Sequence, residues 1–186
     1  ITHYPLLEYV ANKNKPIILS TGASTIEEIS DAVKYLKNSG CNELTLLHCV
    51  SLYPTPADKA NLNVITKLRS IFNLPVGYSD HTLGYHIPLA AIAQGATVIE
   101  KHFTIDKNLP GPDQKISANL VEFKQMVKFG NDIYNSTKDI GKIITEEEKG
   151  MVNVIRRSIV AARDLKKGEI IVKNDIDYKR PGNGIN

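Results

Sequence analysis

Two histidines lie at similar positions in successive segments of the chain and could bind a metal together. His81 ends an apolar, strand-like segment, and His102 ends the next one, 21 residues later. One strand–helix–strand unit has about that length, so parallel neighbouring strands would bring both imidazoles to the same rim. Imidazole is a common ligand for borderline transition metals, and strand ends hold ligands rigidly. The competing interpretation is two unrelated histidines, one of them hydrogen-bonded in the core.

Side-chain alternation supports a shared orientation of the two histidines. It places Glu100 on the same face as His102, and Ser79 on the same face as His81. Asp80 and Glu100 are neighbours of the histidines that could orient them as ligands. For Glu100, an ion pair with a lysine inside the fold is the alternative.

The elements that must position these residues alternate between short apolar strands and helices. Strands are predicted to start near Pro16, Leu44, Pro75 and Thr97, and a capping box at Thr25–Glu28 predicts the start of a helix. Helices are predicted over residues 4–13, 26–40, 62–73, 89–96 and 118–134. This rhythm favours a parallel sheet with helices outside it.

Four strand–helix units are half of an eight-unit barrel, and a small open doubly wound sheet is the competing architecture. In either architecture the active site lies at the C-terminal ends of the strands. The polar residues of interest fall there: Ser20, His48, Ser79, His81, Glu100 and His102.

The rhythm stops near Ile140. A helix is predicted over residues 145–156, followed by short β elements with turns at Lys167-Gly168 and at residues 181–184. These strands are too few to bury a core of their own, which indicates the opening of a second, β-rich module. We therefore expect part of a barrel over residues 1–140, a linker helix over residues 141–155 and a second domain over residues 156–186.

Composition and charge restrict the class of protein. Two cysteines, Cys41 and Cys49, are too few for a disulfide framework, so a reducing cytoplasm is expected. No apolar run approaches the roughly 20 residues of a membrane span, and the N-terminus lacks a signal-peptide layout. The start at Ile1, without an initiator methionine, indicates a fragment.

The net charge of +3 is unevenly distributed. Residues 151–186 hold eight basic and four acidic side chains, a net of +4, whereas residues 1–150 hold 15 basic and 16 acidic ones, a net of −1. The basic segment has no arginine-rich run, so nucleic acid is not the expected partner. The balance permits an anionic small-molecule substrate and is equally compatible with a solvated face.

Six motifs occur in order along the chain: LSTG (19–22), HCVSLYPTP (48–56), GYSDHT (77–82), EKHFT (100–104), PGPD (110–113) and RRSIVA…KRPGNGI (156–185). With them the chain strongly resembles the sialic acid synthase family, meaning N-acetylneuraminate synthase and its legionaminate and pseudaminate relatives. The resemblance implies the C-terminal half of a (β/α)8 TIM barrel followed by the beginning of a small β-rich antifreeze-like (SAF) domain. It also implies a homodimer in which that domain crosses to the partner subunit.

The resemblance implies the chemistry as well. Phosphoenolpyruvate would condense with an N-acyl hexose such as N-acetylmannosamine, consuming water and releasing phosphate and a nine-carbon 2-keto sugar acid. A divalent metal would polarise the sugar aldehyde as a Lewis acid. His81 and His102 match the two metal ligands of the family, with manganese the usual ion and magnesium or cobalt as alternatives.

Substrate contacts follow by the same matching. Ser20 and Ser79 match positions that contact phosphoenolpyruvate, whereas Ser51 stands where relatives often carry asparagine. Tyr53 and Asp113 match positions that contact the sugar. Without the resemblance these would be read as loop serines, a packing aromatic residue and a turn carboxylate.

Three further residues have roles that the resemblance modifies. Arg180 matches an arginine that the second domain of the partner subunit delivers to the site, where its fork suits a carboxylate or acetamido oxygen; alone it would be read as a surface arginine. His48 is expected to line the pocket or to be hydrogen-bonded in the core, because the family uses two histidines. Cys49 is expected to be an inert buried thiol whose basic neighbour in sequence is His48.

The leading hypothesis is thus a metal-dependent synthase that forms a carbon–carbon bond. Within enzymes, a legionaminate or pseudaminate synthase that uses a modified hexose is the alternative. From a different class, a non-catalytic carbohydrate- or metal-binding module would leave phosphoenolpyruvate unbound in a titration. As half a barrel, the chain alone is expected to be inactive.

Overall fold

The structure, a computed structural model, describes residues 1–182 and 185 and divides the chain into two compact units, Ile1–Lys138 and Asp139–Asn186. The first unit contains the sheet that carries the histidines. The second contains the short β elements. The domain boundaries proposed at residues 140 and 155 stay a prediction.

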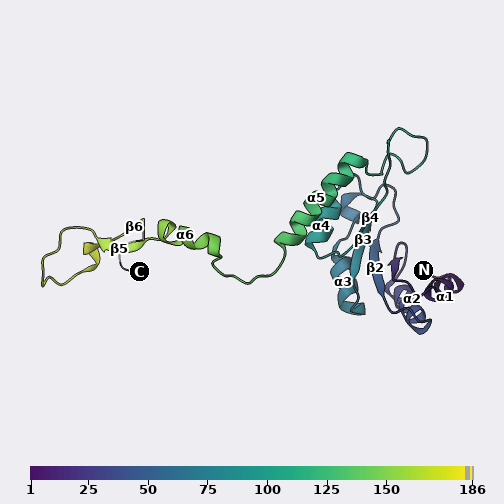
Figure 1. Ribbon diagram of the computed structural model, residues 1–186, viewed down its shortest axis with the longest axis horizontal. Coiled ribbons are helices and arrows are strands. Elements are labelled where there is room, and N and C mark those ends of the chain that lie inside the picture. The colour runs from purple at the N-terminus through teal and green to yellow at the C-terminus, as the bar shows by residue number, and fades with distance from the viewer. Residues whose placement is uncertain (183–184, 186) are drawn as a thin grey trace. The chain divides into compact units, whose positions relative to one another are not determined.

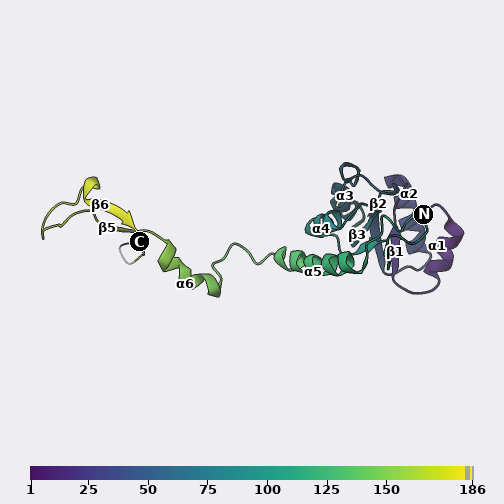
Figure 2. The same ribbon diagram turned by 90° about the horizontal axis from the view of Figure 1, so that it is seen from above.

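The first unit is built on a four-stranded parallel sheet whose strand order follows the chain, β1-β2-β3-β4 (Figures 1 and 2). The strands are β1 (Ile17–Ser20), β2 (Leu44–Cys49), β3 (Val76–Asp80) and β4 (Ile99–Lys101). A doubly wound sheet would reverse its strand order part of the way along, with helices on both faces. This sequential order gives a curled half-barrel instead, as one of the two predicted architectures required.

Helices follow the strands in the predicted alternation: α1 (Tyr4–Ala11), α2 (Ile26–Asn38), α3 (Asn63–Phe72), α4 (His86–Ala93) and α5 (Leu120–Ser136), with a 3-10 turn η1 (Ala57–Lys59) before α3. The predicted capping box at Thr25 and Glu28 is present, and Asn119 with Glu122 forms a second one at the start of α5. Helix α4 begins three residues before the predicted start, because Pro88 lies in its first turn, where proline is tolerated.

Strand β4 is shorter than the predicted strand, which starts near Thr97 and ends at His102. Its ladder with β3 ends at the pair Asp80–Lys101, and Phe103 instead forms an isolated parallel bridge with Ala118. After the intervening loop, the chain thus returns at Ala118 to the sheet edge, beside the residue that follows His102.

The core of the first unit lies between the sheet and its helices (Figures 1 and 2). Its largest fully buried members come from α2, β2, α3 and β3: Leu36, Leu46, Ile65, Leu68, Val76 and Tyr78. On the opposite face of β1, Ile18 is 56% exposed. The helix-covered face therefore stabilises the sheet, and the other face is left for the polar residues at the strand ends.

The second unit contains α6 (Glu146–Ile155) and an antiparallel pair, β5 (Ser158–Ala161) with β6 (Ile176–Lys179), preceded by the 3-10 turn η2 (Lys173–Asp175). Arg163 closes the intervening loop, since its Nε donates to Asp175 Oδ1 at 2.7 Å. The predicted turn at residues 181–184 lies partly outside the described residues. Among the helices described, none combines the length and the apolar character needed to cross a membrane.

Candidate active site

The two histidines meet at the C-terminal rim of the sheet. His81 directly follows β3 and His102 directly follows β4, and the register pairs Asp80 with Lys101, the residues that precede them. The imidazole ring centroids lie 5.2 Å apart with their planes at 67°. This geometry confirms the prediction that the two imidazoles lie at the same rim and project from the same face of the sheet.

Backbone and aromatic contacts fix the ring of His81. Its Nδ1 lies 2.9 Å from the carbonyl oxygen of Val50, and because a carbonyl can only accept, Nδ1 carries the proton. That leaves Nε2 without a proton and with its lone pair available, the arrangement that a histidine needs in order to act as a metal ligand. The ring of Tyr53 covers His81, with centroids 4.2 Å apart, and His81 is only 6% exposed.

Cys49 differs from its predicted environment. It is half-buried, and its Sγ lies 3.9 Å from Nδ1 of His81, so the imidazole beside it belongs to His81 and not to His48. Strand alternation explains the difference, because residues 48 and 49 point to opposite faces of β2. Cys49 pairs with Ser79 in the register of β2 and β3 and therefore lies on the same face of the sheet, at the rim.

Asp113 lies beside His102. Its Oδ2 is 3.6 Å from Nδ1 of His102, and both side chains are partly exposed. The loop that carries Asp113 is tied down at both ends: Ala118 N donates to the His102 carbonyl at 2.8 Å, and Ser117 Oγ donates to the Asp113 carbonyl at 2.7 Å. The Pro-Gly-Pro-Asp turn, distant from the strands in sequence, is therefore held at the rim.

A second polar layer lies one step below the histidines on the same face. Ser79 Oγ donates to Glu100 Oε1 at 2.7 Å, across directly paired positions of β3 and β4. Glu100 thus pairs with a hydroxyl and not with the lysine that was considered for it. The lysine of this region, Lys101, pairs with Asp80 on the helix-facing side, so Asp80 does not orient the histidines by direct contact.

The other predicted serines lie farther along the rim. Ser20 is the last residue of β1. Ser51 lies shortly after β2 and packs against Gly22, where an added Cβ would be 2.5 Å from Ser51 Oγ. Ser51 lines a cavity of about 490 Å³ together with Thr21, Ser24 and Lys67. Ser20 and Ser79 are not among the described lining residues, so this cavity does not unite the three serines.

His48 takes no part in the histidine pair. Its Nε2 donates to the Ala60 carbonyl at 2.8 Å, and burial lowers its pKa. The expected core hydrogen bond is confirmed.

Arg180 belongs to the second unit, where it lines a cavity of about 350 Å³ with Arg157, Tyr178 and Lys179. This cavity gathers three positive charges on a unit that is basic in sequence. Delivery of Arg180 to a partner's site stays a prediction.

The donor set at the rim fits a divalent metal as a partial coordination shell. It offers two imidazoles, one with its tautomer fixed by a carbonyl, as expected of a borderline-metal site. Within the described residues, no group of three or more His, Cys, Asp or Glu side chains is arranged to hold a metal. Two protein ligands would leave the remaining positions to water and substrate.

Comparison with known proteins gives the context of this site. The NeuB family model matches residues 1–143, and the SAF domain model matches residues 156–186. An uncharacterized protein of Methanocaldococcus jannaschii is 55% identical over all of this chain and 55% of its own length. N,N'-diacetyllegionaminic acid synthase of Campylobacter jejuni is 46% identical over all of this chain and 56% of its own length.

Solved structures agree with these matches. The N-acetylneuraminic acid (sialic acid) synthetase of Leptospira borgpetersenii superposes with a TM-score of 0.73 at 38% identity, over 80% of this chain and 52% of that one. The spore coat polysaccharide biosynthesis protein spsE of Bacillus subtilis superposes with a TM-score of 0.70 at 36% identity, over 98% and 55%. The chain spans about half the length of these relatives.

Proposed function

Since this chain belongs to the NeuB family, that of the sialic, legionaminic and pseudaminic acid synthases, we propose that it forms the C-terminal half of such a synthase. The enzyme would condense phosphoenolpyruvate with an N-acyl hexose, such as N-acetylmannosamine. Water is consumed, and phosphate and a nine-carbon 2-keto sugar acid are released. The observation that carries the proposal is the pair of imidazoles 5.2 Å apart at adjacent strand ends.

His81 and His102 would hold a divalent cation, for which we propose Mn²⁺, with Mg²⁺ or Co²⁺ as alternatives. When bound, such a cation supplies Lewis-acid stabilisation of the oxygen of the sugar aldehyde, whose carbon is attacked by C3 of phosphoenolpyruvate. The protein's own part is to keep the two imidazoles close and His81 in one tautomer.

Tyr53 and Asp113 are proposed to position the sugar. Partial burial raises the pKa of Tyr53, and the nearby Cys49, Asp113 and Glu100 raise it further, so its hydroxyl stays protonated and can donate at neutral pH. Asp113 presents a carboxylate that can accept from sugar hydroxyls beside His102. Both residues border the histidine pair, as positions around the reacting aldehyde must.

Ser20, Ser51 and Ser79 are proposed to bind the phosphate and carboxylate of phosphoenolpyruvate. Ser79 already donates to Glu100, so contact with a substrate oxyanion requires its hydroxyl proton to turn away from that carboxylate. Arg180 is proposed to reach the site of the partner subunit, in a homodimer that exchanges its second domains. Its guanidinium would then bind a carboxylate or acetamido oxygen.

The sequence identities to known synthases favour a second candidate for the acceptor sugar. Two N,N'-diacetyllegionaminic acid synthases are 46% and 44% identical to the chain, whereas three pseudaminic acid synthases are 39%, 38% and 37% identical. A diacetamido hexose is therefore the second candidate acceptor.

The full-length protein with Mn²⁺ should release phosphate from phosphoenolpyruvate only when an acceptor is present. N-acetylmannosamine and a diacetamido hexose, assayed separately, would identify the preferred sugar. Phosphate release that is independent of every acceptor would contradict the proposed reaction.

His81→Ala should lower kcat/KM at saturating Mn²⁺ by at least about a hundredfold, because Lewis-acid stabilisation contributes several kcal/mol to the transition state. His3→Ala is the matched control, since His3 is exposed and lies outside the site. Near-wild-type turnover of the His81 variant would refute the metal assignment.

A further inference from the structure

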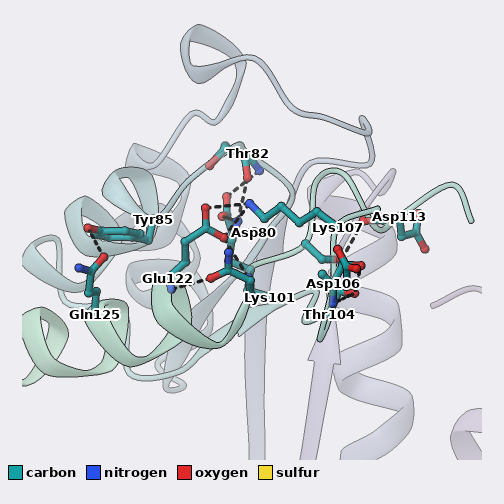
Figure 3. Close-up of polar contacts among 12 residues, drawn as sticks. Asp80, Thr82, Tyr85, Lys101, Thr104, Asp106, Lys107, Asp113, Glu122 and Gln125 are labelled. Atoms are coloured by element: carbon teal, nitrogen blue, oxygen red, sulfur yellow. Dashed lines mark hydrogen bonds and ion pairs between the residues drawn. The ribbon is translucent and has the colours of Figure 1, made fainter. Parts of the chain in front are cut away.

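A buried ion pair joins the two strands that carry the histidines, on the opposite face of the sheet. Lys101 Nζ lies 2.6 Å from Asp80 Oδ2, and their side chains are 1% and 0% exposed (Figure 3). Lys101 Nζ also donates to the Thr82 carbonyl at 2.7 Å, and Asp80 Oδ1 accepts from Thr82 N at 3.0 Å. Lys101 Nζ, both carboxylate oxygens of Asp80 and the backbone N–H and carbonyl of Thr82 all have partners, whereas the buried hydroxyl of Thr82 has none among the described residues.

The network encloses the backbone of His81. Asp80 precedes this histidine and Thr82 follows it, and Lys101 contacts both. Lys101 in turn immediately precedes His102. The ammonium group of Lys101, on β4, therefore binds the chain on both sides of His81.

This position is also the last one in the ladder between β3 and β4. The register runs Tyr78–Ile99, Ser79–Glu100 and Asp80–Lys101, and the two strands end there. No strand pairing between β3 and β4 extends to His81 and His102 themselves. The ion pair is thus the last cross-strand link before the two imidazoles.

Stability alone does not account for burying these charges. Desolvation of a buried ion pair offsets most of its attraction, and apolar side chains of similar volume are often as stabilising. In some proteins a buried, hydrogen-bonded ion pair fixes the local geometry more closely than an apolar contact would.

We propose that Asp80 and Lys101 are a positioning pair that sets the spacing of His81 and His102 for a divalent cation. This inference rests on the proposed function, because the cation gives the spacing its purpose. Neither residue would touch the cation or the substrate. Their effect would pass through the two strand ends.

The test uses the full-length protein and the double variant Asp80→Asn/Lys101→Met. Asparagine keeps an acceptor for Thr82 N–H, methionine keeps the length of the lysine stem, and no buried charge loses its partner. The thermal midpoint should stay close to that of the wild type. The dissociation constant for Mn²⁺, measured by electron paramagnetic resonance of the free ion, should rise about tenfold. This is the effect expected of residues that orient metal ligands without contacting the metal themselves.

The chain offers a matched control in the neighbouring pair Lys107–Glu122. Their side chains meet at 2.7 Å, are 33% and 26% exposed, and join a loop to α5 instead of β3 to β4 (Figure 3). In Lys107→Met/Glu122→Gln the affinity for Mn²⁺ should change less than twofold. The glutamine keeps an acceptor for Asn119 N–H in the capping box of α5.

Mn²⁺ affinity of the double variant equal to that of the wild type would overturn the inference while leaving the proposed function intact. If the wild type itself binds no Mn²⁺, the proposed metal role fails. The inference is then decided by metal-free crystal structures of both proteins: an unchanged ring separation overturns it, and a wider one supports it. Should the double variant not fold, Lys101→Arg, which keeps a positive charge beside Asp80 but changes the length and shape of the side chain, replaces it in both measurements, with the same expected direction.

Discussion

His48 and His81 show how partner choice decides the role of a residue. Each lies at the end of an apolar strand, and each has one ring nitrogen on a backbone carbonyl. His48 uses Nε2 and faces the helix layer, so it belongs to the core. His81 uses Nδ1, which leaves Nε2 at the rim beside His102. Two residues of one type at similar positions thus differ by the nitrogen that the backbone engages.

Burial of His48 predicts a pH dependence of stability. Because burial lowers its pKa in the folded state, below the unfolded value of about 6.5, the unfolded chain binds the proton more readily. Its contribution is fully present above about pH 6.5 and is lost as the pH falls toward the folded-state pKa. His48→Gln should therefore reduce the loss of unfolding free energy between pH 8 and pH 5, measured by urea titration of the full-length protein.

His3→Gln serves as the control for this titration, since His3 is exposed. It should reproduce the wild-type dependence. An equally steep loss of stability in the His48 variant would show that another group controls it.

At the scale of the elements, the approach of β3 to β4 sets the geometry of the rim. Gly77 makes that approach possible, because a Cβ at this position would lie 2.3 Å from the Val98 carbonyl oxygen and 2.6 Å from Leu47 Cδ2. Two strand positions farther along are Ser79 and Glu100, and then the histidines. The close backbone approach near the start of β3 therefore limits how far apart the side chains are at its end.

Gly77→Ala should lower the free energy of unfolding by about 1–3 kcal/mol, the usual cost of overpacking, because a backbone oxygen cannot rotate away. Denaturant titration of the full-length protein measures this. Gly150→Ala is the matched control: Gly150 lies in α6 with nothing within 4 Å of an added Cβ. It should raise stability by about 0.5–1 kcal/mol. Equal effects at both positions would contradict the close approach.

At the scale of the whole molecule, the sheet is half of a closed structure. Within the described residues, β1 and β4 each pair with only one neighbouring strand, and the chain spans about half the length of its relatives. An open strand edge presents unpaired backbone groups and favours association. The inner face of the sheet, with Ile18 exposed, likewise requires a covering layer.

The isolated 186-residue chain should therefore show no synthase turnover. Mixing it with the remaining part of the barrel should restore phosphate release, because the missing strands would cover both edges. Robust turnover by the isolated chain would contradict this expectation.

The succession of strands and helices, and the face of each strand on which the rim residues lie, could be predicted from the sequence. Apolar spacing and capping boxes are local signals, so all four strands of the first unit and the start of α2 were predicted within a few residues. Strand alternation likewise predicted that His81 and His102 share a face, because side chains on a strand repeat every two residues.

The partner of each polar side chain could not be predicted from the sequence and is known from the folded structure. Asp80 pairs with Lys101, Glu100 with Ser79, and Cys49 lies beside His81. These choices depend on strand register and on distances of 2.6 to 3.9 Å between residues that are 21 to 32 positions apart in sequence. A local sequence pattern predicts which face of a strand a residue lies on, but the pairing and curvature of the strands determine which side chains it contacts there.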